Sequence, residues 1–360
     1  MGRARGMARE HPGDTSMRRS GIMHVTALAL AWGTVFAGPL DESFIPSEAA
    51  WILHIDMEQM RASPLATPLR SLAPARPVRA MESVLRGLGL DPEKDVLGLT
   101  LYGEDASDGV TVVTCTPVAD TLANPLATTS LPDYLHETIE GMGVHAWGPK
   151  EARWVATLAT VPGAAHQRIV VIASGMASLR RGIGVLKGQR SRPGDDATAP
   201  LALAPRAQSF VVLRLESEKL RQAQEGLFRS ELFRSASRVS LDLGLIPNEP
   251  QGDASAGHGV VFVEGLVLTE SAEAAAQWER AMQVLLGLGG AAERSERWAQ
   301  AARMASVWAD GTKVHLSFRQ DFDRVASSLG VKDTGVTGTH TRSSGSATGS
   351  SANVDVSEGR

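Results

Sequence analysis

His54 and Asp56 have the residue types and the spacing for chemistry. They lie two apart in a predicted strand at 50–56, and alternate residues of a strand point to the same face. An imidazole and a carboxylate that share a face could bind one metal ion or act together on one substrate. A zinc ion would need a third and usually a fourth ligand, which the fold would have to supply. The other histidines considered as ligands are His145, His166, His258 and His315.

A structural role is the competing interpretation: His54 and Asp56 would form a local ion pair at the solvated edge of a strand. A similar segment later in the chain has Arg214 and Glu216 at the matching places. That segment keeps two opposite charges but not a set of metal ligands, since zinc is bound by Cys, His and carboxylates. We therefore predict no metal ion and no cofactor, and we keep His54 and Asp56 only as catalytic candidates.

Two nucleophile types have ordinary structural interpretations. Cys115 is the only cysteine, which excludes an intramolecular disulfide and a zinc cluster built from cysteines. It lies in an apolar predicted strand, where a lone thiol behaves as a small hydrophobic group. Ser174 lies at a strand-to-helix turn but lacks the first glycine of a G-x-S-x-G elbow, so it is predicted to be a helix N-cap.

The sequence lacks the motifs and the charge that are typical of phosphate-binding and nucleic-acid-binding proteins. The glycines of 182–188 follow neither order of a phosphate-binding loop and indicate the end of a helix. The chain has 36 Lys and Arg against 40 Asp and Glu, so its net charge of −4 does not favour a nucleic-acid partner. Tryptophans on predicted strands and helix stripes are interpreted as packing residues. They are Trp51, Trp147, Trp154, Trp278, Trp298 and Trp308.

Residues 1–37 have the composition of a secretory signal peptide. Arg18 and Arg19 precede a mostly apolar run over 21–36, and the run ends with Val35-Phe36-Ala37. Small residues at the first and third of these last three places are what a signal peptidase reads. We therefore predict an exported protein, periplasmic or extracellular.

The alternative for the leader is an uncleaved anchor in the inner membrane, because 21–40 is about long enough to span a bilayer. Translation from Met17 rather than Met1 would give a more compact leader. No later segment has the long apolar run of a transmembrane helix, so the mature chain is predicted to have no membrane span.

Two pairs of similar segments predict an internal repeat. The segment 51–61 resembles 211–221, and each has an apolar strand, an acidic residue and then a helix start. The segment 88–92 resembles 243–247, and in both a glycine followed by a proline indicates the end of a helix.

Hydrophobic periodicity and turn residues predict mixed strands and helices in both copies. The expected strands are at 50–56, 96–103, 109–116, 144–147, 154–158, 168–173, 209–215, 259–268, 305–309 and 313–318. The expected helices are at 57–71, 78–88, 131–141, 176–187, 217–240, 271–286 and from Asp321 to Leu329.

The fold class predicted from this order is α+β: two tandem ferredoxin-like units of β-α-β-β-α-β type, with antiparallel sheets and helices on one face. The first unit is expected at 44–187 and the second at 206–330, joined by a polar linker at 188–205. Residues 331–360 are rich in Gly, Ser and Thr and predict a disordered tail.

Two motifs carry a resemblance to a group of proteins. The segment 46–65, which contains WILHID and MRASPL, and the segment 89–103, which begins GLDPEKDV, resemble uncharacterised exported proteins of planctomycete-like bacteria. The resemblance is looser over the rest of 45–330. It implies an exported, duplicated α+β body, and it implies no known reaction and no binding residues.

The features together favour a non-catalytic exported protein that binds a partner or ligand, or has a structural role in the cell envelope. The expected binding surface, for an unknown protein or small ligand, is the seam between the two units. The alternative is a hydrolase or metal-dependent enzyme whose site is assembled at that seam, where His54 and Asp56 could take part.

Overall fold

The computed structural model describes most of the chain between Leu40 and Leu329. The described residues are 40–66, 75–105, 109–123, 133–139, 141–148, 154–160, 166–190, 208–216, 234–248, 259–291 and 304–329. The predicted leader at 1–37, most of the predicted linker and the predicted tail at 331–360 lie outside them.

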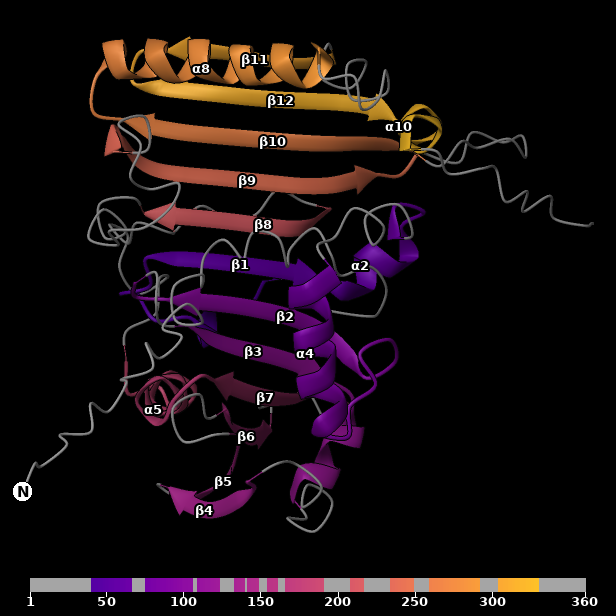
Figure 1. Cartoon of the computed structure of the whole chain (residues 1–360), viewed down its shortest axis with the longest axis vertical. Helices are drawn as coiled ribbons and strands as arrows, with labels where there is room; N and C mark the ends of the chain where they lie inside the picture. Colours follow the sequence, from indigo (N-terminus) through magenta and orange to yellow (C-terminus); the bar gives the residue numbers. More distant parts are fainter. Residues whose placement is uncertain are drawn as a thin grey trace, which may run out of the picture.

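A single antiparallel sheet of twelve strands forms the body of the molecule (Figure 1), in the order β11-β12-β10-β9-β8-β1-β2-β3-β7-β6-β5-β4. The strands are β1 (Trp51–Asp56), β2 (Val96–Gly103), β3 (Val110–Cys115), β4 (Leu135–Ile139), β5 (Met142–Trp147), β6 (Trp154–Thr160), β7 (Arg168–Ala173), β8 (Ser209–Glu216), β9 (Ala236–Ile246), β10 (Val260–Thr269), β11 (Ala305–Asp310) and β12 (Lys313–Asp321). The helices are η2 (Glu42–Phe44), α2 (Met57–Ala62), α4 (Ala75–Gly87), η3 (Pro117–Ala123), α5 (Met176–Leu186), α8 (Ala272–Ala291) and α10 (Phe322–Leu329).

The prediction of two tandem ferredoxin-like units is wrong. In the predicted fold each unit would close its own sheet, but here the first strands of the two halves, β1 and β8, pair with each other in antiparallel fashion. The edge of a sheet has unpaired backbone N–H and C=O groups. Pairing of β1 with β8 bonds these groups to each other and joins the two halves into one continuous sheet. The helices also lie on both faces of the sheet rather than on one, as the two apolar clusters described below show.

The two halves are connected in the same way on either side of the β1–β8 contact. In each half three strands follow one another outward, and a later hairpin returns to pair with the third strand, β6–β7 on β3 and β11–β12 on β10. Leu53 lies directly opposite Leu213, and these two residues hold the same place in the similar segments 51–61 and 211–221. The hairpin β4–β5 belongs to the first half alone within the described residues.

The second pair of similar segments does not hold equivalent places. Leu88 and Gly89 follow the end of α4, as predicted, and Gly89 has the positive φ of +78° that favours glycine. Leu243 and Gly244 lie inside β9 instead. The predicted helix at 217–240 is therefore wrong over 236–240, and the rest of it lies mostly outside the described residues.

The other predicted elements mostly agree with the structure. The predicted helix at 131–141 is wrong, because 135–139 forms the edge strand β4. The hairpin predicted around Asp310-Gly311 is confirmed, and Gly311 has a positive φ of +57° in its turn. The predicted final helix after Asp321 is confirmed as α10.

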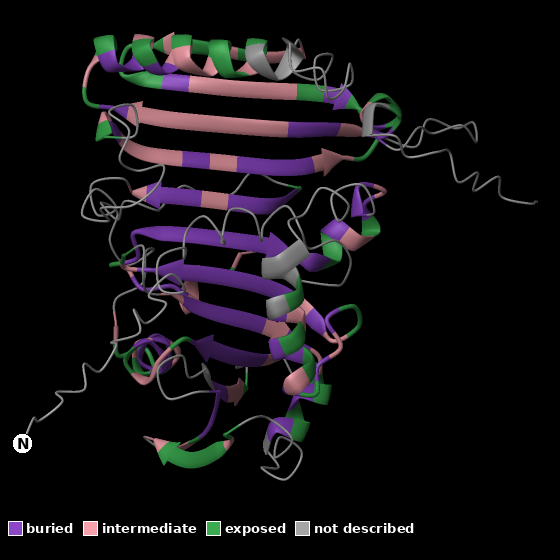
Figure 2. Cartoon of the chain, viewed as in Figure 1, coloured by how far each residue is buried: buried purple, intermediate pink, exposed green. Residues whose placement is uncertain are grey.

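The sheet separates two apolar layers. The face that carries Leu53 and Leu213 is called here the α4 face, because side chains of α2, α4, α8 and α10 pack on it along the sheet. The opposite face, which carries His54 and Arg214, is called the α5 face, and α5 packs there on the first half only. Accordingly β2 and β3 of the first half are almost wholly buried, whereas β10 is mostly of intermediate exposure and β12 is mostly intermediate or exposed (Figure 2).

Close packing of α5 on the sheet depends on a small residue. A Cβ atom at Gly182 would lie 2.9 Å from Cγ1 of Val171 and 3.2 Å from Cγ1 of Val110. The glycines of 182–188 therefore permit a helix to approach the sheet and then end it, with Gly188 at a positive φ of +67°. Their prediction as the end of a helix is confirmed.

We predict that Leu53→Ala lowers the free energy of unfolding by about 2–5 kcal/mol, because the side chain is fully buried at the β1–β8 contact. Urea unfolding followed by circular dichroism would measure this loss. Leu135→Ala is the control, since Leu135 is 51% exposed on the edge strand β4 and should change stability by less than about 0.5 kcal/mol. Equal effects of the two substitutions would contradict the assignment of the core.

Candidate functional site

His54 and Asp56 lie on the α5 face of β1, as their spacing predicts, but they bond to different parts of the fold. His54 is buried, and its Nδ1 is hydrogen bonded to Oγ1 of Thr100 at 2.9 Å. Thr100 is the residue directly opposite His54 on β2. The imidazole thus fixes a cross-strand contact in the middle of the sheet.

Asp56 ends β1 and begins the next helix. Its Oδ1 accepts a hydrogen bond of 2.9 Å from the backbone N–H of Gln59, so the carboxyl group is the N-cap of α2. The residue is only 1% exposed, and its Oδ2 accepts no hydrogen bond from the described residues. Burial, opposed in part by the Gln59 hydrogen bond and reinforced by the charge of Glu58, raises the pKa of Asp56 to about 7.

Arg214 holds the place in β8 that His54 holds in β1, and it is buried as well. Its Nη1 lies 2.7 Å from Oδ1 of Asp242 on the neighbouring strand β9 and also donates to the backbone oxygens of Leu213 and Leu241. The side chain of Arg214 is 2% exposed, so this ion pair is removed from water. The carboxylate that bonds to Arg214 across the sheet is therefore that of Asp242, whereas the spacing in β8 suggested Glu216.

Asp242 is the residue of this region that sequence reasoning missed. It interrupts the alternation of Leu241, Leu243 and Leu245 and points to the opposite face of β9. A lone carboxylate inside an apolar strand is costly unless it is paired, so Asp242 indicates a buried cation nearby. The prediction of a helix ending at 240 hid this pattern.

The residues named so far form one polar group on the α5 face where the two halves meet. This junction cluster consists of His54, Asp56, Thr100, Arg214 and Asp242. Its bonds join β1 to β2, β1 to α2, and β8 to β9. Chemically, these bonds give buried polar side chains their hydrogen-bond partners on neighbouring elements. Asp56 is the member of the cluster whose pKa is raised to about 7.

The other histidines are far from the junction cluster in the strand order. His145 on β5 is buried, its Nδ1 is 2.9 Å from the hydroxyl of Tyr134, and its ring lies 5.1 Å from that of His136. Burial, together with the nearby His136, lowers the pKa of His145. His315 lies on β12, towards the opposite end of the sheet. His166 is exposed before β7, and His258 lies outside the described residues.

These positions do not assemble the zinc site considered for His54 and Asp56. Within the described residues, no group of three or more His, Cys, Asp or Glu side chains is close enough to hold a metal ion.

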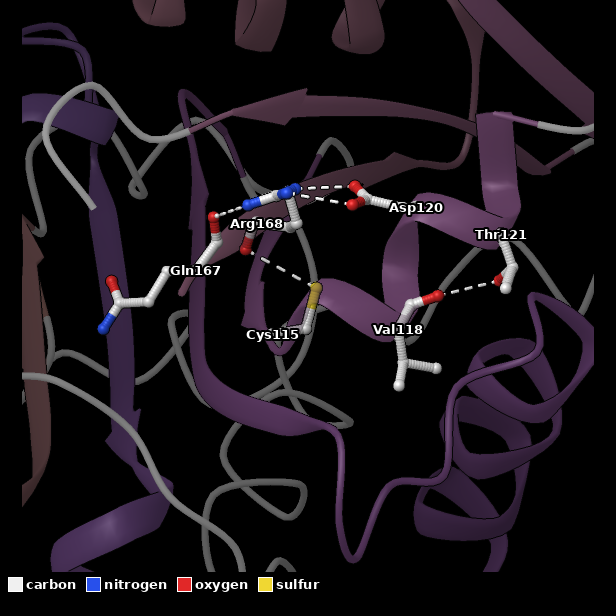
Figure 3. A network of polar contacts seen from close by, with 6 residues as sticks. All are labelled: Cys115, Val118, Asp120, Thr121, Gln167 and Arg168. Atoms are coloured by element: carbon white, nitrogen blue, oxygen red, sulfur yellow. Dashed lines mark hydrogen bonds and ion pairs between the residues drawn. The ribbon is translucent and has the colours of Figure 1, made fainter. Parts of the chain in front are cut away.

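Cys115 is a core residue at the end of β3 (Figure 3). It is fully buried, and its Sγ donates a weak hydrogen bond of 3.5 Å to the backbone oxygen of Arg168 on β7. Burial raises the pKa of the thiol to about 12. A thiol with this pKa is protonated at neutral pH and unreactive, as predicted for a small hydrophobic residue.

Beside Cys115, Arg168 makes a two-bond ion pair with Asp120 of η3 (Figure 3). The Nε and Nη2 atoms of Arg168 lie 2.6 Å and 2.9 Å from the two carboxylate oxygens. The bonds from Arg168 lower the pKa of Asp120, and those from Asp120 raise the pKa of Arg168. The Asp120 carboxylate is half exposed, so this pair is screened by water.

Ser174 is not the N-cap that its position predicted. The N-cap of α5 is Gly175, which makes no side-chain capping bond, and Ser174 is the exposed residue before it. Among the tryptophans whose side chains are described, Trp51, Trp147 and Trp278 are buried, as expected, whereas Trp308 is exposed.

We predict that the stability of the protein falls between about pH 4 and pH 7 because of Asp56. The unfolded carboxyl group ionises near its ordinary pKa of 3.8, while the folded group keeps its proton until about pH 7. Asp56→Asn retains a good N-cap without a charge, so it should stabilise the protein by on the order of 2–4 kcal/mol at pH 8 and have little effect at pH 4.

Urea unfolding of both chains at several pH values would measure this difference. Asp41→Asn is the control, because Asp41 is an exposed N-cap, of η2, whose replacement should give no such pH-dependent gain. A gain from Asp56→Asn that is the same at pH 4 and pH 8 would contradict the burial of an uncharged carboxyl group.

We also predict that Asp242→Ala destabilises the protein by about 3–5 kcal/mol, because it leaves Arg214 buried without its carboxylate. Asp120→Ala should cost less than about 1 kcal/mol, because it removes a solvent-exposed ion pair of similar length. The double substitution Arg214→Met with Asp242→Leu should recover most of the stability. A similar loss for Asp242→Ala and Asp120→Ala in denaturant unfolding would contradict this account.

Comparisons with known protein families, with curated protein sequences and with solved structures found no match. No helix of the described residues is long and apolar enough to cross a membrane. Function must therefore be inferred from the geometry of the junction cluster and from the exposed surfaces of the sheet.

Proposed function

We propose that this protein is exported and acts without catalysis, binding a partner or having a structural role in the cell envelope. The composition of 1–37 supports export. The resemblance of 46–65 and 89–103 to uncharacterised exported proteins supports the same compartment.

The observation that best supports a non-catalytic role is that His54 and Asp56 form hydrogen bonds with different parts of the fold. A catalytic pair has to present both groups to one reacting atom. Here the imidazole bonds across the sheet to Thr100, and the carboxyl group caps α2. Both side chains are nearly inaccessible to solvent, so each acts as a structural group of the fold.

The sequence predicted that a partner or ligand binds at the seam between the two halves. The burial of the seam residues favours a binding surface elsewhere on the sheet. Ile52, Leu53, Val212 and Arg214 are buried or partly buried in the β1–β8 ladder, so the seam offers no open cleft between these strands. A protein or small ligand would bind to the exposed parts of the sheet instead, such as the α5 face of the second half.

A second candidate function, hydrolysis or metal-dependent catalysis at the junction cluster, is favoured by one observation. A carboxyl group with a pKa of about 7 is suited to exchange protons with a substrate at neutral pH. Such a substrate would have to displace the residues that bury Asp56, because the side chain is 1% exposed.

Secretion of the full chain in a Gram-negative host tests export. We expect the periplasmic fraction to contain a chain that begins at Gly38, as measured by intact mass, because cleavage should follow Ala37. The control Ala37→Arg should block this cleavage by placing a large charged residue at the site. A full-length chain in the cytosol would overturn the proposal, and an uncleaved chain in the membrane would support the anchor.

A screen with chromogenic esters, phosphate esters and glycosides, with and without zinc, tests the catalytic alternative. We expect no turnover above that of the heat-denatured protein. Turnover that is abolished in His54→Gln or Asp56→Asn, while circular dichroism shows a folded chain, would overturn the non-catalytic role.

A further inference from the structure

No described helix contributes to an apolar cluster on the α5 face of the second half. α8 and α10 contribute Trp278, Phe322 and Ala326 to apolar clusters on the α4 face. α5, which packs on the α5 face, contacts strands of the first half. The outer strands β11 and β12 therefore present a set of accessible side chains on this face.

Trp308 is the prominent apolar group on this surface. It lies on the terminal strand β11 and is 44% exposed. Its indole ring stacks on the imidazole of His315, with ring centroids 5.0 Å apart and planes only 11° from parallel. The two residues are direct partners in the β11–β12 register, so the strand pairing holds the indole in a fixed orientation.

Polar side chains flank this stacked pair on both sides. Along the two strands, Ser306 lies opposite Ser317 on one side of Trp308, and Asp310 lies opposite Lys313 on the other. Residues two apart in a strand share a face and are separated by about 7 Å. A ring bound on the indole face turned away from His315 would thus have the exposed hydroxyl group of Ser306 and carboxylate of Asp310, on the same strand, near its edge.

One neighbouring group is already engaged within the fold. Glu264 of β10 accepts hydrogen bonds from Ser317 at 3.1 Å and from Arg319 at 3.0 Å. These bonds orient the inner side of the surface. Ser306, Asp310 and Lys313 are exposed on its outer side.

We propose that Trp308 and His315, with the flanking polar side chains, form a binding site for a glycan of pyranose sugars whose substituents are equatorial. Such a sugar has an apolar face of C–H groups that packs on an aromatic ring, and hydroxyl groups around its rim that hydrogen bond to polar side chains. The site matches both parts: one oriented, half-exposed indole, and hydrogen-bonding groups at its borders.

A glycan fits this surface better than a protein partner. Protein interfaces bury roughly 800 Å² on each side and have an apolar centre within a polar rim. Of the described large apolar residues that are exposed, Trp308 is the one on this face of β11 and β12. Its neighbours on these two strands are polar, and Leu266 of β10, opposite His315, is only partly exposed. Addition of a peptide strand is disfavoured at β11, because Glu279 of α8 accepts a hydrogen bond of 3.2 Å from the backbone N–H of Ala309. Figure 1 shows α8 lying along this strand.

This inference rests on the proposed exported, non-catalytic function, which places the chain among envelope glycans. The test uses the full mature chain and saturation-transfer NMR with two probes, cellohexaose and N-acetylchitohexaose, which separate a glucan source from an amino-sugar source. Maltohexaose, whose α-linkages curve the chain, is the ligand control. We expect binding to at least one of the two probes and much weaker binding to maltohexaose.

Substitutions then locate the site. Trp308→Ala should weaken binding at least about tenfold, and Trp308→Phe less, because an aromatic ring is kept. Leu135→Ala, at the other end of the sheet, should leave binding unchanged. Circular dichroism and thermal unfolding would establish that each variant is folded.

Three outcomes would overturn the site: no binding of either probe by the wild-type chain, equal binding by Trp308→Ala, or Trp308-dependent self-association that excludes the probes and so identifies a protein interface. The proposed function fails separately, if the chain stays in the cytosol or turns over a substrate. A periplasmic, inactive chain that binds no probe would therefore refute the glycan site alone.

Discussion

Five residue pairs between β1 and β8 hold the two halves of the molecule in one sheet. Both strands are at the centre of the strand order, and Leu53 and Leu213 face each other in the middle of the contact. Each strand would otherwise be an edge with unpaired backbone groups, which have to be bonded when they are buried. The apolar layer on the α4 face continues across this contact from Leu53 to Val211 and on to Val261, so its integrity depends on this pairing.

The same contact explains why the buried polar residues are concentrated there. A strand at the centre of a large sheet is shielded on both faces, so any polar side chain on it requires a partner. His54 and Arg214 meet that requirement on the adjacent strands β2 and β9. Asp56 meets it in part, because one oxygen caps α2, and burial raises the pKa of its carboxyl group to about 7.

Local patterns predicted most elements of the fold, because they report which side of an element is apolar. The strand β4 escaped because its side chains are nearly all exposed, so 135–139 has no alternation of burial and the apolar residues Leu135 and Ile139 have the spacing of a helix face. The strand β9 did alternate, at Val239, Leu241, Leu243 and Leu245, but a helix was extended over its start. The pairing of β1 with β8 was beyond local reasoning, because it joins residues about 160 positions apart.

The candidate residues show the same limit. The shared face of His54 and Asp56 follows from their spacing, whereas Thr100 and Asp242 were identified only by the register of neighbouring strands. Spacing along one strand therefore suggested an ion pair within β8, although the carboxylate bonded to Arg214 lies across the sheet on β9.

The two ends of the sheet differ in a way that limits how copies of the chain could associate. At one end, α8 lies along β11, and Glu279 occupies a backbone donor of that strand. At the other end, β4 is the terminal strand and its side chains at 135–138 are exposed. Growth of a fibre by strand addition requires two open ends, since each molecule has to receive one neighbour and offer an edge to the next. With β11 obstructed in this way, pairing through β4 would join two molecules about a two-fold axis and leave no open strand edge for a third.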